Sequence, residues 1–213
     1  MTEYTEQMKV WGGDFGREWT ERCDLGVVGT DARFLADVGC TRSAMYQEFL
    51  ADVSRDIRVL EVASNIGTQL TTLERLGFTR LYGVELQDYA VQKSRGFNPR
   101  LNIVQGSAFD VPFKDGFFDL VYTSVFLIHL APADLPKALA EIHRVSRRWI
   151  MGYEYFSEQM VEVNYRGHAN LLWKGDYCQA YLDSFPDLRL VKRKRYDYAD
   201  GKQDEMFLLA KGA

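Results

Sequence analysis

The sequence predicts an α/β fold built on a mostly parallel sheet. From Ile57 onward, short apolar runs alternate with amphipathic stretches, the order typical of a parallel sheet with right-handed crossovers. The first run, residues 57–62, is rich in branched residues, as in a strand buried on both faces. Two runs near the C-terminus flank a turn-forming stretch at 197–201 and predict an antiparallel pair. We therefore expect a seven-stranded sheet with helices on both faces and an antiparallel C-terminal strand.

The N-terminal part of the chain is expected to lie outside this sheet. Three aromatic residues recur there at helical spacing: Trp11, Phe15 and Trp19. The glycine pair at 12–13 interrupts that spacing, so we expect a loop and then a helix from about Asp14, an N-cap residue. Residues 23–56 look helical. We take residues 1–56 as an N-terminal helical lid or cap and residues 57–213 as the core of a single-domain protein.

The core is expected to alternate strands and helices. Strands are predicted near residues 57–62, 80–84, 101–105, 118–123, 149–153, 188–196 and 205–210. Helices are predicted near residues 67–77, 87–95, 133–147 and 176–184. The intervening residues 154–174 are polar and aromatic without clean periodicity. A stretch of that length without regular structure in a compact domain is typically functional.

Composition disfavours several classes of protein. A formal net charge of −4 speaks against a nucleic-acid backbone as the main partner. No apolar run approaches the ~20 residues of a transmembrane helix, and the N-terminus lacks a signal pattern. The three cysteines, Cys23, Cys40 and Cys178, are far apart, which is typical of reduced thiols rather than of disulfides or a zinc site. We expect a cytoplasmic protein with a small-molecule partner and no metal.

The turn after the first strand is the candidate ligand site. It leads into a helix, whose N-terminal N–H groups favour a polar or anionic ligand. Three positions stand where a dinucleotide-binding loop has glycine: Ala63, Asn65 and Gly67. Such a loop suits a ligand with a carboxylate and an ammonium better than two phosphates, and Glu61 could pair with its cation. Glu85 ends the second strand, where a carboxylate can accept both hydrogen bonds of a ribose diol.

These residues resemble a known family. Residues 61–67 look like the first motif of class I S-adenosylmethionine-dependent methyltransferases, with Ala63 in place of the usual first glycine. Glu85 matches the ribose-binding acid of that family, and residues 106–110 match the segment that flanks adenine. The resemblance covers residues 57–153. It implies a Rossmann-like class I methyltransferase fold, with S-adenosylmethionine as cofactor and S-adenosylhomocysteine as product.

The resemblance also implies how the cofactor site is divided. The methionine end would contact Glu61, Ala63, Asn65 and Gly67; the ribose, Glu85 and Leu86; the adenine, Ser107, Ala108 and Phe109. A narrower resemblance, to methyltransferases found with pseudaminic acid biosynthesis, rests on residues 11–16 and 161–168. It implies a lid containing Trp11 and Phe15 and a sugar acid or related intermediate as methyl acceptor.

Candidate catalytic and substrate-binding residues follow the fourth and fifth strands. His129, Glu154 and His168 could move the proton that methyl transfer to oxygen or nitrogen releases. The substrate-binding candidates are Tyr155, Asn164, Tyr165, Arg166 and Asn170. Arg166 offers a planar fork for a carboxylate or phosphate. The structural alternative for these residues is a loop held together by its own contacts, and a lone histidine is more often structural than catalytic.

The predicted function is methyl transfer from S-adenosylmethionine to O or N of a small polar metabolite, by a monomer or homodimer. One alternative is a non-catalytic S-adenosylmethionine-binding module, which Ala63 in the motif leaves open. A nicotinamide-dependent oxidoreductase is disfavoured by the missing glycine pattern. An RNA methyltransferase is disfavoured by net charge. The one basic run, residues 192–195, is expected to protect an edge strand rather than to bind an anionic partner.

Overall fold

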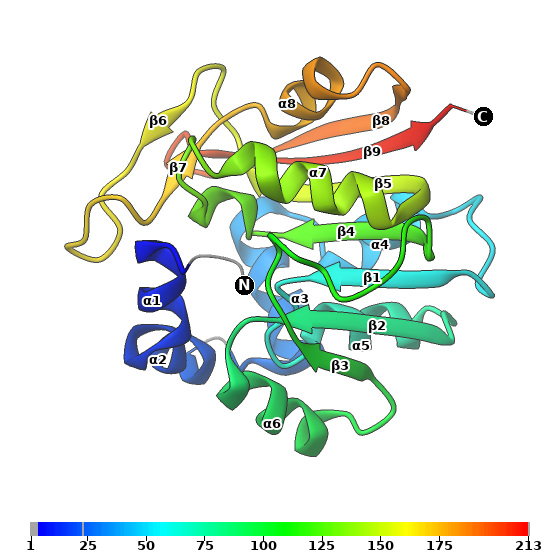
Figure 1. Cartoon of the computed structure of the whole chain (residues 1–213), viewed down its shortest axis with the longest axis horizontal. Helices are drawn as coiled ribbons and strands as arrows, with labels where there is room; N and C mark the ends of the chain where they lie inside the picture. Colours follow the sequence, from blue (N-terminus) through cyan, green and yellow to red (C-terminus); the bar gives the residue numbers. More distant parts are fainter. Residues whose placement is uncertain (1–3, 23, 213) are drawn as a thin grey trace.

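A seven-stranded sheet forms the centre of the protein. The computed structural model describes residues 4–22 and 24–212, so Cys23 lies outside the described residues. The strands follow the order β3-β2-β1-β4-β5-β9-β8 (Figure 1). Their bounds are β1 Arg58–Val62, β2 Arg80–Glu85, β3 Asn102–Gln105, β4 Phe118–Ser124, β5 Ser146–Tyr155, β8 Leu188–Asp197 and β9 Gln203–Lys211. The predicted α/β fold and its seven strands are confirmed.

In this sheet, β9 runs antiparallel to its two neighbours, and the other strands run parallel to one another. β1 pairs in parallel with β2 on one side and with β4 on the other, and β4 pairs in parallel with β5. β9 pairs antiparallel with both β5 and β8. The strand order reverses between β1 and β4, and in open α/β sheets ligands bind beyond the carboxyl ends of the strands at such a point.

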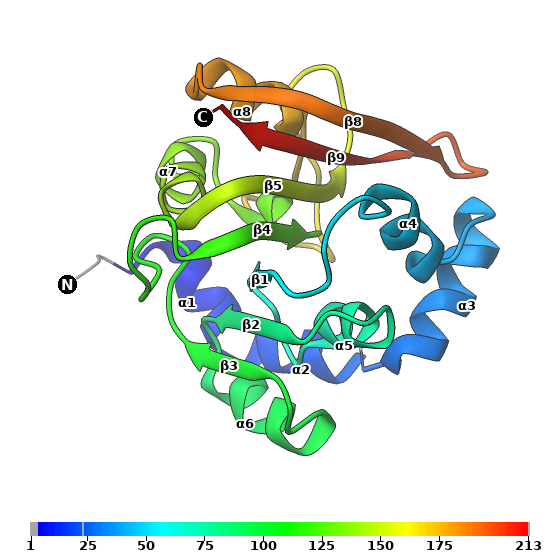
Figure 2. The ribbon, with the colours of Figure 1, turned by 90° about the vertical axis from the view of Figure 1, so that its right-hand side faces the viewer.

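Helices cover both faces of the sheet. Their bounds are α1 Glu6–Gly12, α2 Asp14–Arg22, α3 Gly26–Val38, α4 Arg42–Phe49, α5 Thr68–Arg75, α6 Asp88–Phe97, α7 Leu135–Val145 and α8 Tyr177–Ser184. Apolar residues of α4 and α5 pack against one face, and those of α7 and α8 against the other. Figure 2 shows α3, α4 and α5 on one side of the sheet and α7 on the other. None of the described helices is long and apolar enough to cross a membrane.

The structure corrects the sequence prediction at α1 and at the end of α7. The loop expected before Asp14 is wrong, because residues 6–12 form α1. Thr5 caps that helix by accepting the N–H of Met8 at 3.2 Å, and the break comes at Gly13. The helix predicted to begin at about Asp14 is confirmed as α2. The helix predicted over 133–147 ends at Val145, where β5 begins directly.

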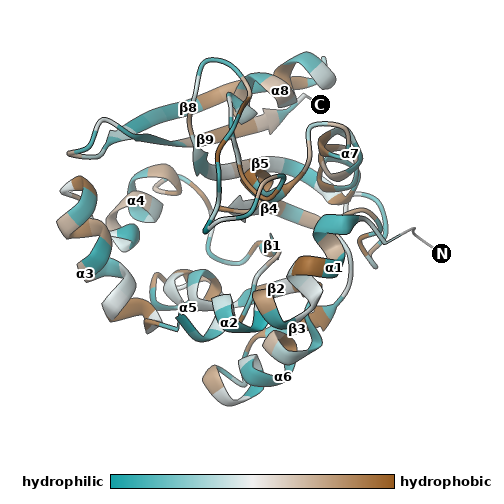
Figure 3. Cartoon of the chain, turned by 90° about the vertical axis from the view of Figure 1, so that its left-hand side faces the viewer, coloured by the Kyte–Doolittle hydropathy of each residue, from teal (hydrophilic) through white to brown (hydrophobic). Residues whose placement is uncertain are grey.

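The segment after β5 is mostly irregular, as predicted. Within it, two short strands pair antiparallel: β6 Val161–Glu162 and β7 Trp173–Lys174. Figures 1 and 3 show this segment together with α1 and α2 at the end of the sheet to which the parallel strands point. Two segments far apart in sequence therefore flank the carboxyl ends of the strands.

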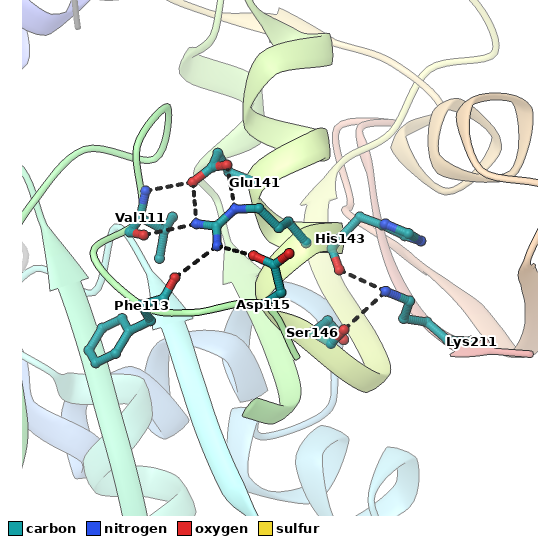
Figure 4. Close-up of polar contacts among 8 residues, drawn as sticks. Val111, Phe113, Asp115, Glu141, His143, Ser146 and Lys211 are labelled. Atoms are coloured by element: carbon teal, nitrogen blue, oxygen red, sulfur yellow. Dashed lines mark hydrogen bonds and ion pairs between the residues drawn. The ribbon is translucent and has the colours of Figure 1, made fainter. Parts of the chain in front are cut away.

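The loop between β3 and β4 is tied to α7. Arg144 of α7 donates to the carbonyls of Val111 (3.0 Å) and Phe113 (2.8 Å). Glu141 accepts the N–H of Val111 at 2.8 Å, and Glu141 and Asp115 both pair with Arg144 at 2.7 Å (Figure 4). Charge-assisted hydrogen bonds are stronger than neutral ones. This cluster therefore fixes the segment just before Val111, which carries the adenine-flanking candidates.

Candidate active site

A first pocket lies at the carboxyl ends of the parallel strands, beneath α1 and α2. Its walls include Trp11, Trp19 and Thr20 of these helices, Ala63 and Asn65 after β1, residues 85–87 after β2, residues 106–109 after β3 and residues 124–126 after β4. Most of the predicted cofactor residues thus lie in one place. Gly67 and Phe15 do not line this pocket, and Glu61 borders the pocket beside it.

The turn after β1 has an unusual backbone. Ala63 and Asn65 have positive φ values, 60° and 47°, a conformation that costs a non-glycine residue about 1–3 kcal/mol. The Asn65 side chain accepts the N–H of Ile66 at 2.8 Å, which stabilises the turn. Gly67 has φ 85°, and a Cβ there would lie 2.5 Å from the Leu101 side chain. Gly67 therefore shapes the turn from behind, while Ala63 and Asn65 line the pocket.

Glu85 holds two turns together at the end of β2. Its carboxylate is buried and accepts the backbone N–H groups of Asn65 and Gln87, each at 2.8 Å. Burial raises the pKa of Glu85, and the hydrogen bonds from Gln87 and Asn65 oppose that rise. Each carboxylate oxygen can accept more than one hydrogen bond, so Glu85 retains capacity for hydroxyl groups in the pocket.

Gln87 and Thr20, which the sequence analysis missed, attach α1 and α2 to the strand ends. The buried Gln87 amide donates to the carbonyls of Trp11 (3.1 Å) and Gly13 (3.2 Å). Its oxygen accepts the Thr20 hydroxyl at 3.2 Å, and Thr20 in turn accepts the Asn65 amide at 2.8 Å. The two helices are therefore held over the first pocket by side chains from the turns that follow β1 and β2.

An aromatic cluster borders the pocket on the side of α1 and α2. The Trp11 ring lies 4.3 Å from the ring of His129, and Phe15 packs edge-on against Trp11 at 5.2 Å. The Trp19 indole N–H donates to the Tyr165 hydroxyl at 3.1 Å. Phe15 therefore supports Trp11 from behind, and Trp19 joins α2 to the segment after β5.

A second pocket adjoins the first. The two share Trp19, Ala63, Asn65, Ser124, Val125 and His129. Beyond this junction the second pocket is polar, with Arg33, Asp37, Glu61, Gln69, Tyr155, Tyr165, Arg166, Tyr198 and Asp204 among its lining residues. The two pockets are therefore continuous where these six residues line both. A ligand in the first pocket can contact a different molecule in the second at this junction.

His129 stands at the junction as a neutral imidazole. Its Nδ1 lies 2.7 Å from the carbonyl oxygen of Leu171. Because a carbonyl only accepts, Nδ1 carries the proton and Nε2 keeps its lone pair. Burial lowers the pKa of His129 to about 4. The ring can therefore accept a hydrogen bond at neutral pH, but it is a weaker base than the sequence analysis expected.

Glu61 lies one residue before the end of β1, beside the junction. Its carboxyl group is buried and accepts the Tyr122 hydroxyl at 3.0 Å. Burial raises the pKa of Glu61 to about 8, although the Tyr122 hydrogen bond lowers it. A cation placed beside Glu61 would favour its ionised form.

The two other predicted proton-transfer residues lie away from both pockets. Glu154 is buried, accepts the Thr123 hydroxyl at 2.8 Å and the N–H of Phe126 at 3.0 Å, and so anchors the loop that carries His129. Burial raises the pKa of Glu154 to about 8. His168 is exposed, and its ring packs 5.2 Å from that of Phe15. Glu154 therefore positions the loop that carries His129, and His168 lies at the surface.

The substrate-binding candidates divide into two groups. Tyr155, Tyr165 and Arg166 line the second pocket. Asn164 and Asn170 line neither pocket and instead stabilise turns. Asn164 accepts the N–H of Gly167 at 2.9 Å, and the N–H of Asn170 donates to a carboxylate in the same segment at 2.6 Å. Three of the five predicted substrate-binding residues therefore line the second pocket.

The pockets fit the cofactor implied by the resemblance. The indole N–H of Trp11 is buried without a hydrogen-bond partner among the described residues, and Trp11 lines the first pocket. A polar ligand there would supply the missing acceptor. The carboxylates Glu85 and Glu61 stand at separate places, suited to a diol and to an ammonium group. In the described part of the chain, no His, Cys, Asp and Glu side chains form a group that could hold a metal.

Comparisons with known proteins find methyltransferases among the proteins similar to this chain. Residues 60–148 match the family model described as a methyltransferase domain. An uncharacterised methyltransferase of Synechocystis is 34% identical over 93 residues, which are 44% of this chain and 43% of the relative. An uncharacterised Haemophilus influenzae protein is 33% identical over 98 residues, 43% of this chain and 39% of the relative. The chain thus matches less than half the length of these curated relatives.

Solved structures share the whole architecture. The 1,6-didemethyltoxoflavin-N1-methyltransferase of Burkholderia thailandensis, solved with 1,6-didemethyltoxoflavin and S-adenosylhomocysteine, superposes with a TM-score of 0.73. It is 17% identical, and the match covers all of this chain and 92% of that one. A Pyrococcus horikoshii protein superposes with a TM-score of 0.68 at 16% identity over 93% of this chain and 99% of that one. At such identities these structures establish the fold, which is the Rossmann-like methyltransferase fold.

Proposed function

We propose that this protein is an S-adenosylmethionine-dependent methyltransferase that acts on O or N of a small polar metabolite. The observation that carries the proposal is the junction of the two pockets at Ala63, Val125 and His129. One pocket has a buried carboxylate suited to a ribose, and the other is polar. Methyl transfer needs two ligands that meet end to end, and this geometry provides for both. The methyltransferase-domain match over residues 60–148 supports the same reaction.

The chain's own residues would act mainly by positioning. When bound, S-adenosylmethionine supplies an electrophilic methyl group. Glu85 would accept the ribose hydroxyls, and Glu61 would pair with the ammonium group. Trp11, with α1 and α2, would act as the lid and exclude water from the junction. Holding two reactants in line contributes much of the rate acceleration in such displacements.

His129 would orient the methyl acceptor. Its Nε2 is free to accept a hydrogen bond from a hydroxyl or amine, because Nδ1 is bound to the Leu171 carbonyl. That hydrogen bond would direct a lone pair of the acceptor toward the methyl group. With a pKa near 4, the imidazole would orient the acceptor rather than store its proton.

The second pocket offers Arg166 to a polar, anionic acceptor. Its carboxylates already have donors: Glu61 binds Tyr122, Asp204 binds Tyr153 and Tyr198, and Asp37 binds Arg33. Arg166 has no hydrogen-bond or ion-pair partner among the described residues. The guanidinium of Arg166 is thus available to bind a carboxylate or phosphate of the acceptor. A sugar acid of the kind implied by the narrower resemblance has this chemistry.

The basic run on β8 favours a small molecule over RNA. Lys192 and Lys194 pair with Glu48, and Arg193 and Arg195 pair with Glu205. Each of these cations thus already has a carboxylate partner within the chain, which weakens the run as a site for phosphates. The free thiols of Cys40 and Cys178 support a cytoplasmic location.

Calorimetry with S-adenosylmethionine and S-adenosylhomocysteine tests the proposal. We expect a single site for each, and methyl transfer to an acceptor that carries an acidic group. Binding by neither compound contradicts the proposal. Cofactor binding without transfer to any polar acid, amine or sugar offered would favour the non-catalytic binding module instead.

A further inference from the structure

Arg42, the first residue of α4, is a buried cation that no carboxylate of the described residues binds. Its side chain has no exposed surface. The guanidinium lies over the ring of Tyr153, with Cζ 3.7 Å from the centroid, and 5.1 Å from the rings of Tyr46 and Phe34. Among the described residues it forms no ion pair. A guanidinium stays charged in proteins, so the interior beside α4 holds a permanent positive charge.

The guanidinium holds part of the pocket wall from behind. Nη2 donates to the Ser124 hydroxyl at 2.5 Å, and Nε donates to the Gln69 side-chain oxygen at 3.3 Å. The Tyr46 hydroxyl donates to the same Gln69 oxygen at 3.2 Å. Ser124 lies at the junction of the two pockets, and Gln69 lines the second. Arg42 thus joins α4, α5 and β4 at the wall that faces both ligands.

The charge of Arg42 also reaches Glu61. Burial, the largest effect, raises the pKa of Glu61, while the Tyr122 hydrogen bond and the charge of Arg42 lower it. The other groups around Glu61 are Glu85 of β2, whose charge raises that pKa, the N–H of Leu70 of α5, which lowers it, and Tyr46 of α4. Of these groups Arg42 is the cation. Its field also lowers the pKa of Asp204 of β9, again against burial.

We propose that Arg42 is a positioning residue of the cofactor site, which fixes the wall at Ser124 and Gln69 and supplies the charge that allows Glu61 to bind a cation as a carboxylate. The proposal rests on the proposed function, since it takes the ammonium group of the cofactor as that cation. Arg42 contacts neither ligand pocket itself, so its effect passes through Glu61, Ser124 and Gln69.

The test is the pH dependence of S-adenosylhomocysteine binding. The carboxylate form of Glu61 binds the ammonium, so affinity should rise with pH up to the pKa of Glu61 in the free protein and then level off. Arg42→Met removes the charge at similar length. The midpoint of the rise should move up by about one pH unit, and affinity at neutral pH should fall by about tenfold. Ionisation of the ligand is common to all variants and cancels in the comparison.

Three control variants separate charge from geometry. Arg42→Lys keeps the charge but loses the planar fork, so affinity should fall while the midpoint stays. Ser124→Ala should do the same, because it removes only the hydroxyl that Arg42 binds. Glu61→Gln should abolish the rise itself.

Several outcomes would overturn the proposal. An unchanged midpoint in folded Arg42→Met excludes the role of charge. If that variant does not fold, wild-type affinity in both Arg42→Lys and Ser124→Ala still excludes the positioning role. Failure of the wild-type protein to bind S-adenosylhomocysteine would instead contradict the proposed function.

Discussion

Glu85 and Glu61 lie near the carboxyl ends of neighbouring strands, yet their partners suit them to different tasks. Both oxygens of Glu85 accept backbone N–H groups, from Asn65 and Gln87, which oppose the effect of burial. Glu61 accepts one hydroxyl, from Tyr122, and burial raises its pKa to about 8. Glu85 is thus a fixed acceptor, and Glu61 is a group that ionises more fully when a cation arrives.

Replacement of Glu85 tests the ribose assignment. In Glu85→Ala the hydroxyls of the ligand lose a charged acceptor, and two backbone N–H groups lose theirs. We expect the affinity for S-adenosylhomocysteine, measured by calorimetry, to fall by about tenfold or more. Glu158→Ala, at an exposed position outside both pockets, should bind like the wild type. Wild-type affinity in Glu85→Ala would show that the ribose lies elsewhere.

The protonation of His129 can be measured directly. Because burial lowers its pKa to about 4, ¹⁵N NMR of the ring should show Nδ1 protonated and Nε2 unprotonated at neutral pH. The unfolded chain binds this proton near pH ~6.5. The contribution of His129 to stability is therefore complete above that pH and is lost as the pH falls from ~6.5 toward 4. A ring that titrates near ~6.5 in the folded protein would contradict the burial argument.

Helices α1 and α2 are held at the pocket by a small number of polar contacts. Gln87 binds one carbonyl in the last turn of α1 and one at Gly13, where the chain breaks between the helices, and Thr20 binds both Gln87 and Asn65. On the outer side, Glu21 pairs with Tyr89 and Lys93 of α6. Movement of α1 and α2 away from the strand ends would expose the first pocket without disturbing the sheet.

Loss of the Gln87 amide should loosen the pair. In Gln87→Ala two carbonyls and the Thr20 hydroxyl lose a buried partner, so amide hydrogen exchange in residues 6–22 should accelerate by about tenfold or more. Exchange in β1 and β4 should not change. Gln92→Ala, at an exposed site on α6, provides the matched control. Equal exchange in the two variants would mean that other contacts hold α1 and α2 in place.

Sequence periodicity predicted the strands of the sheet, because most of them are short apolar runs separated by helices or turn-forming residues. The prediction failed at two helix ends, where the local sequence signal did not match the observed boundary. The glycine pair at 12–13 led us to expect a loop. Gly12 is instead the last residue of α1, where the cost of glycine is small, and the N-cap at Thr5 starts that helix. The C-terminus of α7 passes directly into β5 without the turn residues that would mark the boundary.

The site was predictable only in part, and for a physical reason. Parallel topology brings strand ends together, so Ala63, Asn65 and Glu85 could be placed from their position along the chain. The roles of Gln87 and Arg42 arise from contacts between residues 27 to 82 positions apart, which leave no local pattern. His168 has suitable chemistry, but its segment turns it to the surface.

Across the whole molecule, two segments remote in sequence flank the carboxyl ends of the parallel strands. The proposed methyl transfer requires that a nucleoside cofactor binds between them. A crystal structure of the protein with S-adenosylhomocysteine measures this directly. We expect the ribose hydroxyls on Glu85, the adenine beside Phe109 and the amino-acid end at the turn after β1. A ligand bound elsewhere, or a complex in which Glu85 touches no part of it, would contradict the proposed site.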